Sequence, residues 1–188
     1  MNPSLQRLLS VAPPPTAPVA PGSPDQWAGV EKEIGASLPQ DFKDYTATYG
    51  AGQWADFFGI MDPFYKWKHP QASKSWREWM HKRIGSLEEM RREWPKYTAP
   101  FLPHPAPEGL LAFGYDDNGG TLCWQMRGSP DSWPIICLDG KLSEEYDSFP
   151  MPLTEFLAFL VTGKIAPETF PPDLFPIQPP AFRSYTNE

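Results

Sequence analysis

Histidine, cysteine and basic residues are scarce in this sequence. Its 188 residues contain three histidines and two cysteines, and 23 aspartates and glutamates outnumber 16 lysines and arginines, giving a net charge of −7. Binding to nucleic-acid phosphates needs clustered lysine and arginine. The one basic cluster, at residues 74–92, is interleaved with glutamates. We therefore expect no nucleic-acid partner, and the acidic balance favours a basic protein partner.

Catalytic and metal-binding patterns are also missing. His69, His81 and His104 lie far apart and match no His-x-x-x-His or His-Glu-x-x-His spacing. The acidic run at 116–118 is out of register with a calcium-binding loop and is better explained as a turn. Cys123 has no histidine partner in a recognisable motif, and no Gly-x-Ser-x-Gly elbow occurs. The sequence predicts a protein that is not an enzyme, with no metal and no cofactor.

Long apolar runs are lacking too. No stretch approaches the ~20 apolar residues of a membrane-spanning helix, and residues 1–10 do not resemble a secretory signal. We expect a cytoplasmic protein with no membrane partner, in which Cys123 and Cys137 stay reduced. Both cysteines are predicted to be small buried residues on neighbouring strands, which would allow them to face each other.

Aromatic residues and prolines, in contrast, are abundant. Aromatic residues make up 14% of the chain, enough for a packed core, and many of the 25 prolines lie near the two ends. We divide the chain into a short helix with a proline-rich connector (1–24), an α+β domain (25–166) and a proline-rich tail (167–188). Within this domain, residues from about 61 to 107 are predicted to form a helical insertion. Apolar side chains such as Phe170 would hold the tail on the body.

The strongest structural signal is the stretch 109–124, which reads GLLAFGYDDNGGTLCW. It predicts two apolar strands, 110–115 and 121–126, joined by an Asp-Asn-Gly-Gly turn. Further strands are predicted at 53–60, at 133–139 and, as a short element, at 142–149.

Helices are predicted where apolar residues recur at helical spacing. These segments are 2–10, 25–35, 39–50, 73–94 and 153–162. Pro39 suits the first turn of its helix, and Gly85 favours a bend or break in the long one. Trp76 and Trp79 continue an apolar stripe, which favours a place in the core over exposed stacking positions.

Three blocks in this order resemble one protein family. They are residues 33–43 followed by Tyr49-Gly50, residues 109–124, and residues 131–136 with the later helix that ends at Gly163. Together, over roughly residues 24–163, they resemble the SUKH superfamily of Smi/Knr-like proteins. The resemblance implies a single α+β domain with a central, mainly antiparallel sheet flanked by helices. It also implies an immunity protein that neutralises a toxin, often a nuclease, or a regulatory interaction protein like the fungal relatives.

Neither of these uses requires an active site, so candidate partner-binding residues are chosen by charge. The acidic candidates are Asp116, Asp117, Glu144, Glu145 and Asp147, with Trp54 and Asp56 as a second group. Residues assigned to maintaining the fold are Pro39, Gly109, Gly114, Trp124 and Trp133.

Two functional hypotheses remain open. The chain either blocks the active site of a cognate toxin or acts as a scaffold whose proline-rich flanks dock into aromatic grooves of partners. The sequence does not define the oligomeric state.

Overall fold

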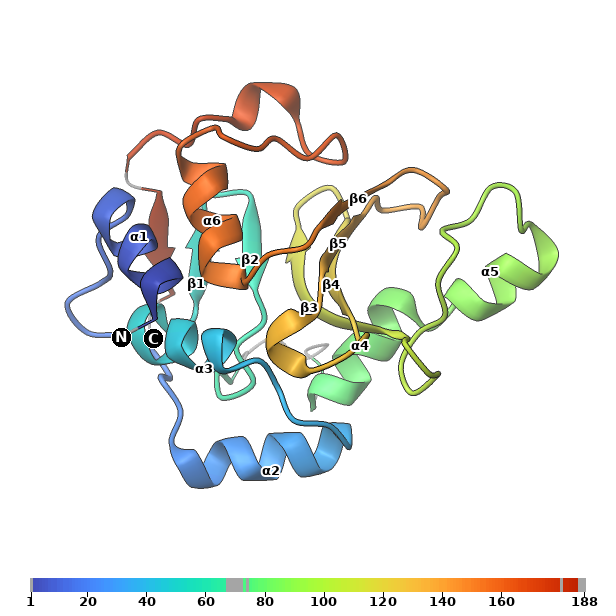
Figure 1. The fold of residues 1–188 in the computed structure, drawn as a ribbon, viewed down its shortest axis with the longest axis horizontal. Coiled ribbons are helices and arrows are strands. Elements are labelled where there is room, and N and C mark those ends of the chain that lie inside the picture. Colours follow the sequence, from blue (N-terminus) through green and yellow to red (C-terminus); the bar gives the residue numbers. More distant parts are fainter. Residues whose placement is uncertain (1, 67–72, 74, 180, 186–188) are drawn as a thin grey trace.

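The computed structural model describes residues 2–66, 73, 75–179 and 181–185. His69, part of the expected insertion and the last three residues lie outside the described residues. In the described residues, an antiparallel sheet runs through the molecule with helices packed around it (Figure 1).

Within the described part of the chain, the sheet has seven strands in the order β6-β5-β4-β3-β2-β1-β7, and every neighbouring pair is antiparallel. This confirms the predicted α+β fold with an antiparallel sheet. The strands are β1 (Gly52–Trp54), β2 (Phe58–Ile60), β3 (Leu110–Asp116), β4 (Thr121–Gln125), β5 (Ile135–Leu138), β6 (Tyr146–Phe149) and β7 (Phe182–Ser184).

The helices lie close to where the apolar spacing predicted them. They are α1 (Pro3–Val11), α2 (Pro24–Ile34), α3 (Gln40–Tyr49), α4 (Trp76–Ile84), α5 (Leu87–Glu93) and α6 (Leu153–Val161), with short 3₁₀ turns at Pro130–Ser132 and Pro172–Leu174. The expected break falls at Gly85, between α4 and α5. Serine side chains cap α2 and α4 by accepting hydrogen bonds from backbone N–H groups in the first turn.

Two strands are shorter in the structure than the sequence predicted. The segment 53–60 is not one strand but a hairpin, because Ala55 and Asp56 have φ of 53° and 50° and turn the chain between β1 and β2. The segment 142–149 becomes a strand only at Tyr146, so Glu144 and Glu145 lie in the loop before β6.

Segments near both ends of the described chain pack on the folded body. In the tail, β7 pairs with β1 from Gly52↔Ser184 to Trp54↔Phe182, and Phe170 is buried. At the other end, α1 packs against α6. Segments outside the predicted 25–166 domain thus contact it, through β7 on β1 and α1 on α6.

The register decides which side chains share a face of the sheet. Trp54, Phe58 and Asp116 are direct cross-strand neighbours, so they lie on one face, and Tyr115 lies on the other. The Trp54 face packs against α3, where the Trp54 indole donates to the Tyr45 hydroxyl at 3.0 Å. The Tyr115 face packs against α4.

The strand pairing also separates the two cysteines. Cys137 lies opposite Leu122, and Cys123 lies opposite Ile136, so the two thiols point to opposite faces of the sheet. The expectation that the two thiols face each other was wrong, and the prediction that both cysteines are buried is confirmed. Burial raises the pKa of the Cys123 thiol, which keeps it protonated and a poor nucleophile at neutral pH.

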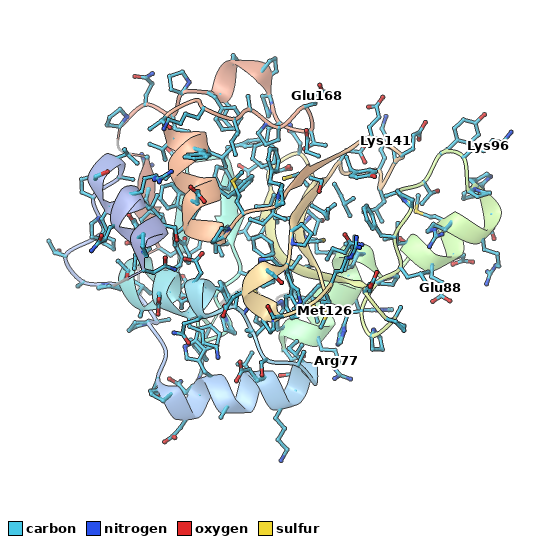
Figure 2. The ribbon with its side chains drawn as sticks, in the orientation of Figure 1. Arg77, Glu88, Lys96, Met126, Lys141 and Glu168 are labelled. Carbon is cyan, nitrogen blue, oxygen red and sulfur yellow. The ribbon has the colours of Figure 1, made fainter. Side chains whose placement is uncertain are left out.

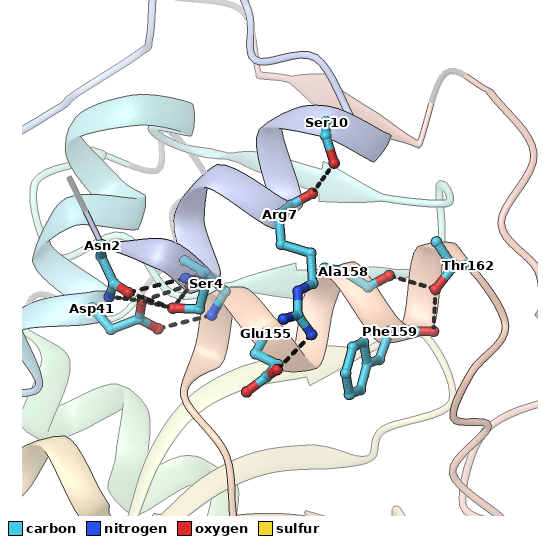
Figure 3. Close-up of polar contacts among 10 residues, drawn as sticks. Asn2, Ser4, Arg7, Ser10, Asp41, Glu155, Ala158, Phe159 and Thr162 are labelled. Carbon is cyan, nitrogen blue, oxygen red and sulfur yellow. Dashed lines mark hydrogen bonds and ion pairs between the residues drawn. The ribbon is translucent and has the colours of Figure 1, made fainter.

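Three helix beginnings meet at one buried carboxylate, that of Asp41 in the first turn of α3 (Figure 3). Its Oδ1 accepts hydrogen bonds from the Asn2 amide at 2.8 Å and the Thr154 hydroxyl at 2.6 Å, and its Oδ2 accepts one from the Thr154 backbone N–H at 2.8 Å. The Ser4 hydroxyl lies 3.3 Å from Oδ1. Burial raises the pKa of Asp41, and the hydrogen bonds from Thr154 and Ser4 oppose that shift.

This cluster predicts the effect of removing one hydroxyl. We expect Thr154→Val to lower the free energy of unfolding by about 1–3 kcal/mol, because it leaves the buried Asp41 oxygen short of a donor. Urea denaturation measures the change. Thr162→Val is the matched control, since the exposed Thr162 hydroxyl only bonds carbonyls of its own helix. Equal losses in the two variants would contradict a special role for the Asp41 cluster.

Candidate protein-binding surface

Three turns meet at one end of the sheet, the upper side of Figure 1. Because the strands alternate in direction, the β1–β2, β3–β4 and β5–β6 connections emerge at the same end. They comprise residues 55–57, 117–120 and 139–145. Gly140 comes so close to the β3–β4 turn that an added Cβ would lie 2.7 Å from the Asn118 carbonyl oxygen. The predicted acidic residues, scattered in sequence, are therefore collected at one end by topology.

Four of the acidic candidates are exposed on these turns: Asp56, Asp117, Glu144 and Glu145. We call this set the acidic end. Asp56 forms an ion pair with Arg183 at 3.0 Å, and the Gln53 amide donates weakly to Asp117 at 3.3 Å. Lys141 in the same loop is also exposed, and Figure 2 shows it on the upper side with Glu168. Acidic side chains thus outnumber basic ones at this end.

The other two acidic candidates, Asp116 and Asp147, stabilise the fold. Asp116 is buried, and its Oδ1 accepts hydrogen bonds from the backbone N–H groups of Asn118 and Gly120, each at 2.8 Å. Burial raises the pKa of Asp116, and these two hydrogen bonds act against the rise. Asp147 accepts hydrogen bonds from the backbone N–H groups of Glu168 and Thr169 at 3.0 and 3.1 Å. The first carboxylate shapes the β3–β4 turn, and the second attaches the tail to β6.

Trp54 also points inward, with its side chain fully buried between β1 and α3. It therefore offers no contact area to a partner. The residues predicted to maintain the fold lie at a helix end or in the interior. Pro39 is the N-cap of α3, and Trp124 and Trp133 are buried. Gly114 has no room for a side chain, because a Cβ would lie 2.9 Å from the Gly59 carbonyl oxygen.

Gly109 has an equally tight position, since a Cβ there would lie 2.7 Å from the Ala106 carbonyl oxygen. Its own carbonyl accepts a hydrogen bond from the Met126 backbone N–H at 3.0 Å. A side chain at this position would collide with the backbone of residues 103–106.

Sequence reasoning missed an exposed group of aromatic residues beside the acidic end. Trp94 and Tyr97 are 55% and 67% exposed, and Tyr146 is 39% exposed. The Phe101 ring meets the Tyr146 ring edge-on at 4.9 Å between centroids. We call Trp94, Tyr97, Phe101 and Tyr146 the aromatic patch. The helix predicted over residues 73–94 includes Trp94, but α5 ends at Glu93, so helical periodicity does not orient this side chain.

A backbone hydrogen bond brings the aromatic patch to the acidic end. The Ala99 N–H donates to the Leu142 carbonyl at 3.0 Å, so the segment after α5 lies against the loop that carries Glu144 and Glu145. Figure 1 shows this segment and the β5–β6 loop on the same upper right side. Exposed Trp and Tyr side chains are typical of surfaces that bind proteins.

A groove of about 1110 Å³ lies elsewhere, between the end of α2, α4 and the loop at 103–106. Ile34, Met80 and Ile84 form its apolar part, while His81 and His104 lie at its wall. The His104 Nε2 is hydrogen-bonded to the Ile34 carbonyl at 2.9 Å. This bond joins two segments of the fold, and within the described residues no group of three or more His, Cys, Asp or Glu side chains is placed to hold a metal ion.

Asp62 is a second buried carboxylate, and hydrogen bonds reach only one of its two oxygens. Its Oδ1 accepts hydrogen bonds from the backbone N–H groups of Phe64 and Tyr65 at 2.8 and 3.2 Å. Its Oδ2 is buried and has no hydrogen-bond partner among the residues that the structure describes. Burial raises the pKa of Asp62 to about 7, and the two hydrogen bonds reduce the shift. The carboxyl group therefore titrates near neutral pH.

Comparison with known proteins gives one match. Residues 21–158 match the SMI1 / KNR4 family (SUKH-1). No match was found among curated proteins or among solved structures. In the part of the chain that the structure describes, no helix has the length and apolar character needed to cross a bilayer.

The raised pKa of Asp62 predicts how stability depends on pH. The folded protein keeps the Asp62 proton between the ordinary pKa of 3.8 and about 7, whereas the unfolded chain loses it. Stability from this group is therefore present below the ordinary pKa and is lost as pH rises toward 7. We expect Asp62→Asn to remove a decrease on the order of 3 kcal/mol between pH 4 and pH 8.

Urea denaturation of both proteins across this pH range measures the difference. Other groups also titrate, so the quantity to compare is the gap between the two curves at each pH. Curves that run parallel from pH 4 to pH 8 would contradict the buried, half-satisfied state of Asp62.

Proposed function

Since the chain belongs to the SMI1 / KNR4 family (SUKH-1), whose model covers residues 21–158, we propose that it is an immunity protein. It binds a cognate toxin in the cytoplasm and blocks the toxin's active site without catalysing a reaction. The observation that carries this proposal is the convergence of four exposed carboxylates, from three separate turns, beside the aromatic patch.

The chemistry of the acidic end suits a nuclease-type toxin. A nuclease must present a basic groove to the phosphates of its substrate. Glu144, Glu145 and Asp117 would enter the positive potential of that groove and occupy the place of phosphates. Complementary charges also speed diffusional encounter, which lets an inhibitor act before the toxin finds nucleic acid.

The aromatic patch would supply the affinity that charge alone does not. Blocking an enzyme in competition with its substrate needs nanomolar binding, about −12 kcal/mol. An interface of roughly 1,600 Å² reaches this only with a few well-buried anchors, and such anchors are most often Trp, Tyr and Arg. Trp94, Tyr97 and Tyr146 have the size and exposure to serve as anchors.

The arrangement of the tails favours immunity over the scaffolding alternative. Docking through proline-rich flanks requires extended segments that partners can reach. Here Ala181 and Ile177 are buried, β7 pairs with β1, and Val19 of the connector bridges to Gly50. Both proline-rich segments are anchored to the fold at these points, which favours the acidic end as the candidate surface.

Co-expression tests the proposal directly. The chain is produced together with the toxin domain encoded next to it in its own genome, and survival of the host cells is compared with cells that make the toxin alone. Survival combined with a stable one-to-one complex supports immunity. A toxin that is neither bound nor neutralised would remove the basis of the proposal.

Charge reversal at the acidic end predicts a kinetic effect. Glu144→Lys with Glu145→Lys should slow association with the toxin by roughly tenfold or more at low salt and reduce its salt dependence, because steering charge is lost. Stopped-flow or surface-plasmon measurements give the on-rate. The control is Asp25→Lys with Glu33→Lys on the exposed face of α2, which changes the net charge equally at a distant place. Equal effects of the two pairs would contradict a local role of the acidic end.

A further inference from the structure

β6 is a terminal strand of the sheet. The strand order begins with β6, which pairs with β5 on one side through the register Ile135↔Phe149 to Leu138↔Tyr146. Its side chains are half-buried or exposed, unlike the buried strands β4 and β5 beside it. A strand in this position presents backbone N–H and C=O groups toward its open side.

The alternating hydrogen bonds between β4, β5 and β6 identify which backbone groups of β6 point away from the sheet. The Gln125 N–H donates to the Pro134 carbonyl at 3.0 Å, so this pair and every second pair after it are hydrogen-bonded between β4 and β5. On β5, residues 134, 136 and 138 therefore bond to β4, and residues 135 and 137 bond to β6. The partners of these two on β6 are Phe149 and Asp147.

Tyr146 and Ser148 therefore direct their backbone N–H and C=O groups away from the sheet. Both residues are exposed, and among the described residues no backbone hydrogen bond from another segment reaches these groups. The outer side of β6 is thus a short row of unsatisfied donors and acceptors that water covers in the free protein.

Two segments flank this open side without closing it. On one face of the sheet the Phe101 ring packs on Tyr146, and on the other face the backbone at Glu168 and Thr169 is held by the Asp147 carboxylate. An added strand would lie between these segments, with Phe101 and Tyr146 available to its side chains.

Charge indicates what kind of strand fits. The loop that leads into β6, residues 139–145, contains three acidic residues and one lysine. Glu144 and Glu145 are exposed immediately before Tyr146, and Glu168 is exposed beside Asp147. A second copy of this chain would bring the same acidic loop to the edge, whereas a strand with Lys or Arg would find complementary charges.

We propose that the open side of β6 binds an extended, basic segment of a partner protein, which adds to the sheet as an eighth strand beside β6. The Tyr146 and Ser148 backbone groups supply the hydrogen bonds, Phe101 and Tyr146 contact side chains on one face, and Glu144 and Glu145 select basic residues. The assignment rests on the proposed function only in taking the partner to be a protein.

A peptide library tests this assignment without the toxin. A random nonapeptide library displayed on phage is panned against the full chain, and the strongest peptide is synthesised and titrated by calorimetry. We expect enriched peptides to be basic and rich in β-branched residues. On binding, the amide hydrogen exchange of Tyr146 and Ser148 should slow at least tenfold. Acidic or helix-forming peptides, no binding up to millimolar concentration, or unchanged exchange at these two amides would overturn the proposal.

One pair of variants isolates the backbone hydrogen bond. Ser148→Pro removes the outward N–H without touching the bonds to β5, and proline is tolerated on an edge strand in that position. Ser148→Ala keeps the N–H and changes the side chain only. We expect at least tenfold weaker peptide binding for Ser148→Pro and less than twofold change for Ser148→Ala. Equal affinities of the two variants would refute strand addition, and thermal unfolding checks that Ser148→Pro is folded.

Two further outcomes are informative. Analytical ultracentrifugation that shows a stable dimer, abolished by Ser148→Pro, would assign the edge to self-association and overturn the proposal. Failure of toxin neutralisation together with intact peptide binding would remove the proposed function and leave the edge assignment standing. Neutralisation that is unaffected by Ser148→Pro, with no peptide binding, would remove the edge assignment alone.

Discussion

The buried carboxylate of Asp41 is the contact on which the arrangement of the helices depends. Burying a carboxylate is costly unless its oxygens are hydrogen-bonded, and here the donors come from the beginnings of α1 and α6. Only three residues separate β6 from α6. Anchoring the Thr154 backbone therefore also positions the end of the strand whose outer side is open. A core polar contact thus determines where a surface strand lies.

The acidic residues have different roles, and their hydrogen bonds show which role each one has. Asp116 and Asp147 accept hydrogen bonds from backbone N–H groups. Asp116 thereby shapes the β3–β4 turn, and Asp147 attaches the tail to β6. Glu144 and Glu145, in contrast, remain exposed two residues and one residue before β6. Carboxylates that accept hydrogen bonds within the fold fix the turns at this end of the sheet, and a preorganised surface loses less entropy of its own on binding. The exposed carboxylates are then free to act through charge.

Predictions from sequence were most accurate where local rules decide structure. The turn at 117–120, the break at Gly85 and the start of α3 after Pro39 all follow from the preferences of glycine, asparagine and proline. They failed where distant segments decide. The hairpin inside 53–60 depends on pairing with β3 and β7. The exposure of Trp94 depends on where α5 ends relative to the sheet, which apolar spacing cannot show.

The sequence by itself determined the fold class, the position of most helices and strands, the family and the excess of negative charge. These follow from periodicity, turn chemistry and composition, which are local or additive properties. Only the tertiary structure decided which carboxylates are buried, that three distant turns share one end of the sheet, and that Tyr146 and Ser148 face outward. Strand order and register set these features, and both arise from long-range pairing that no single segment encodes.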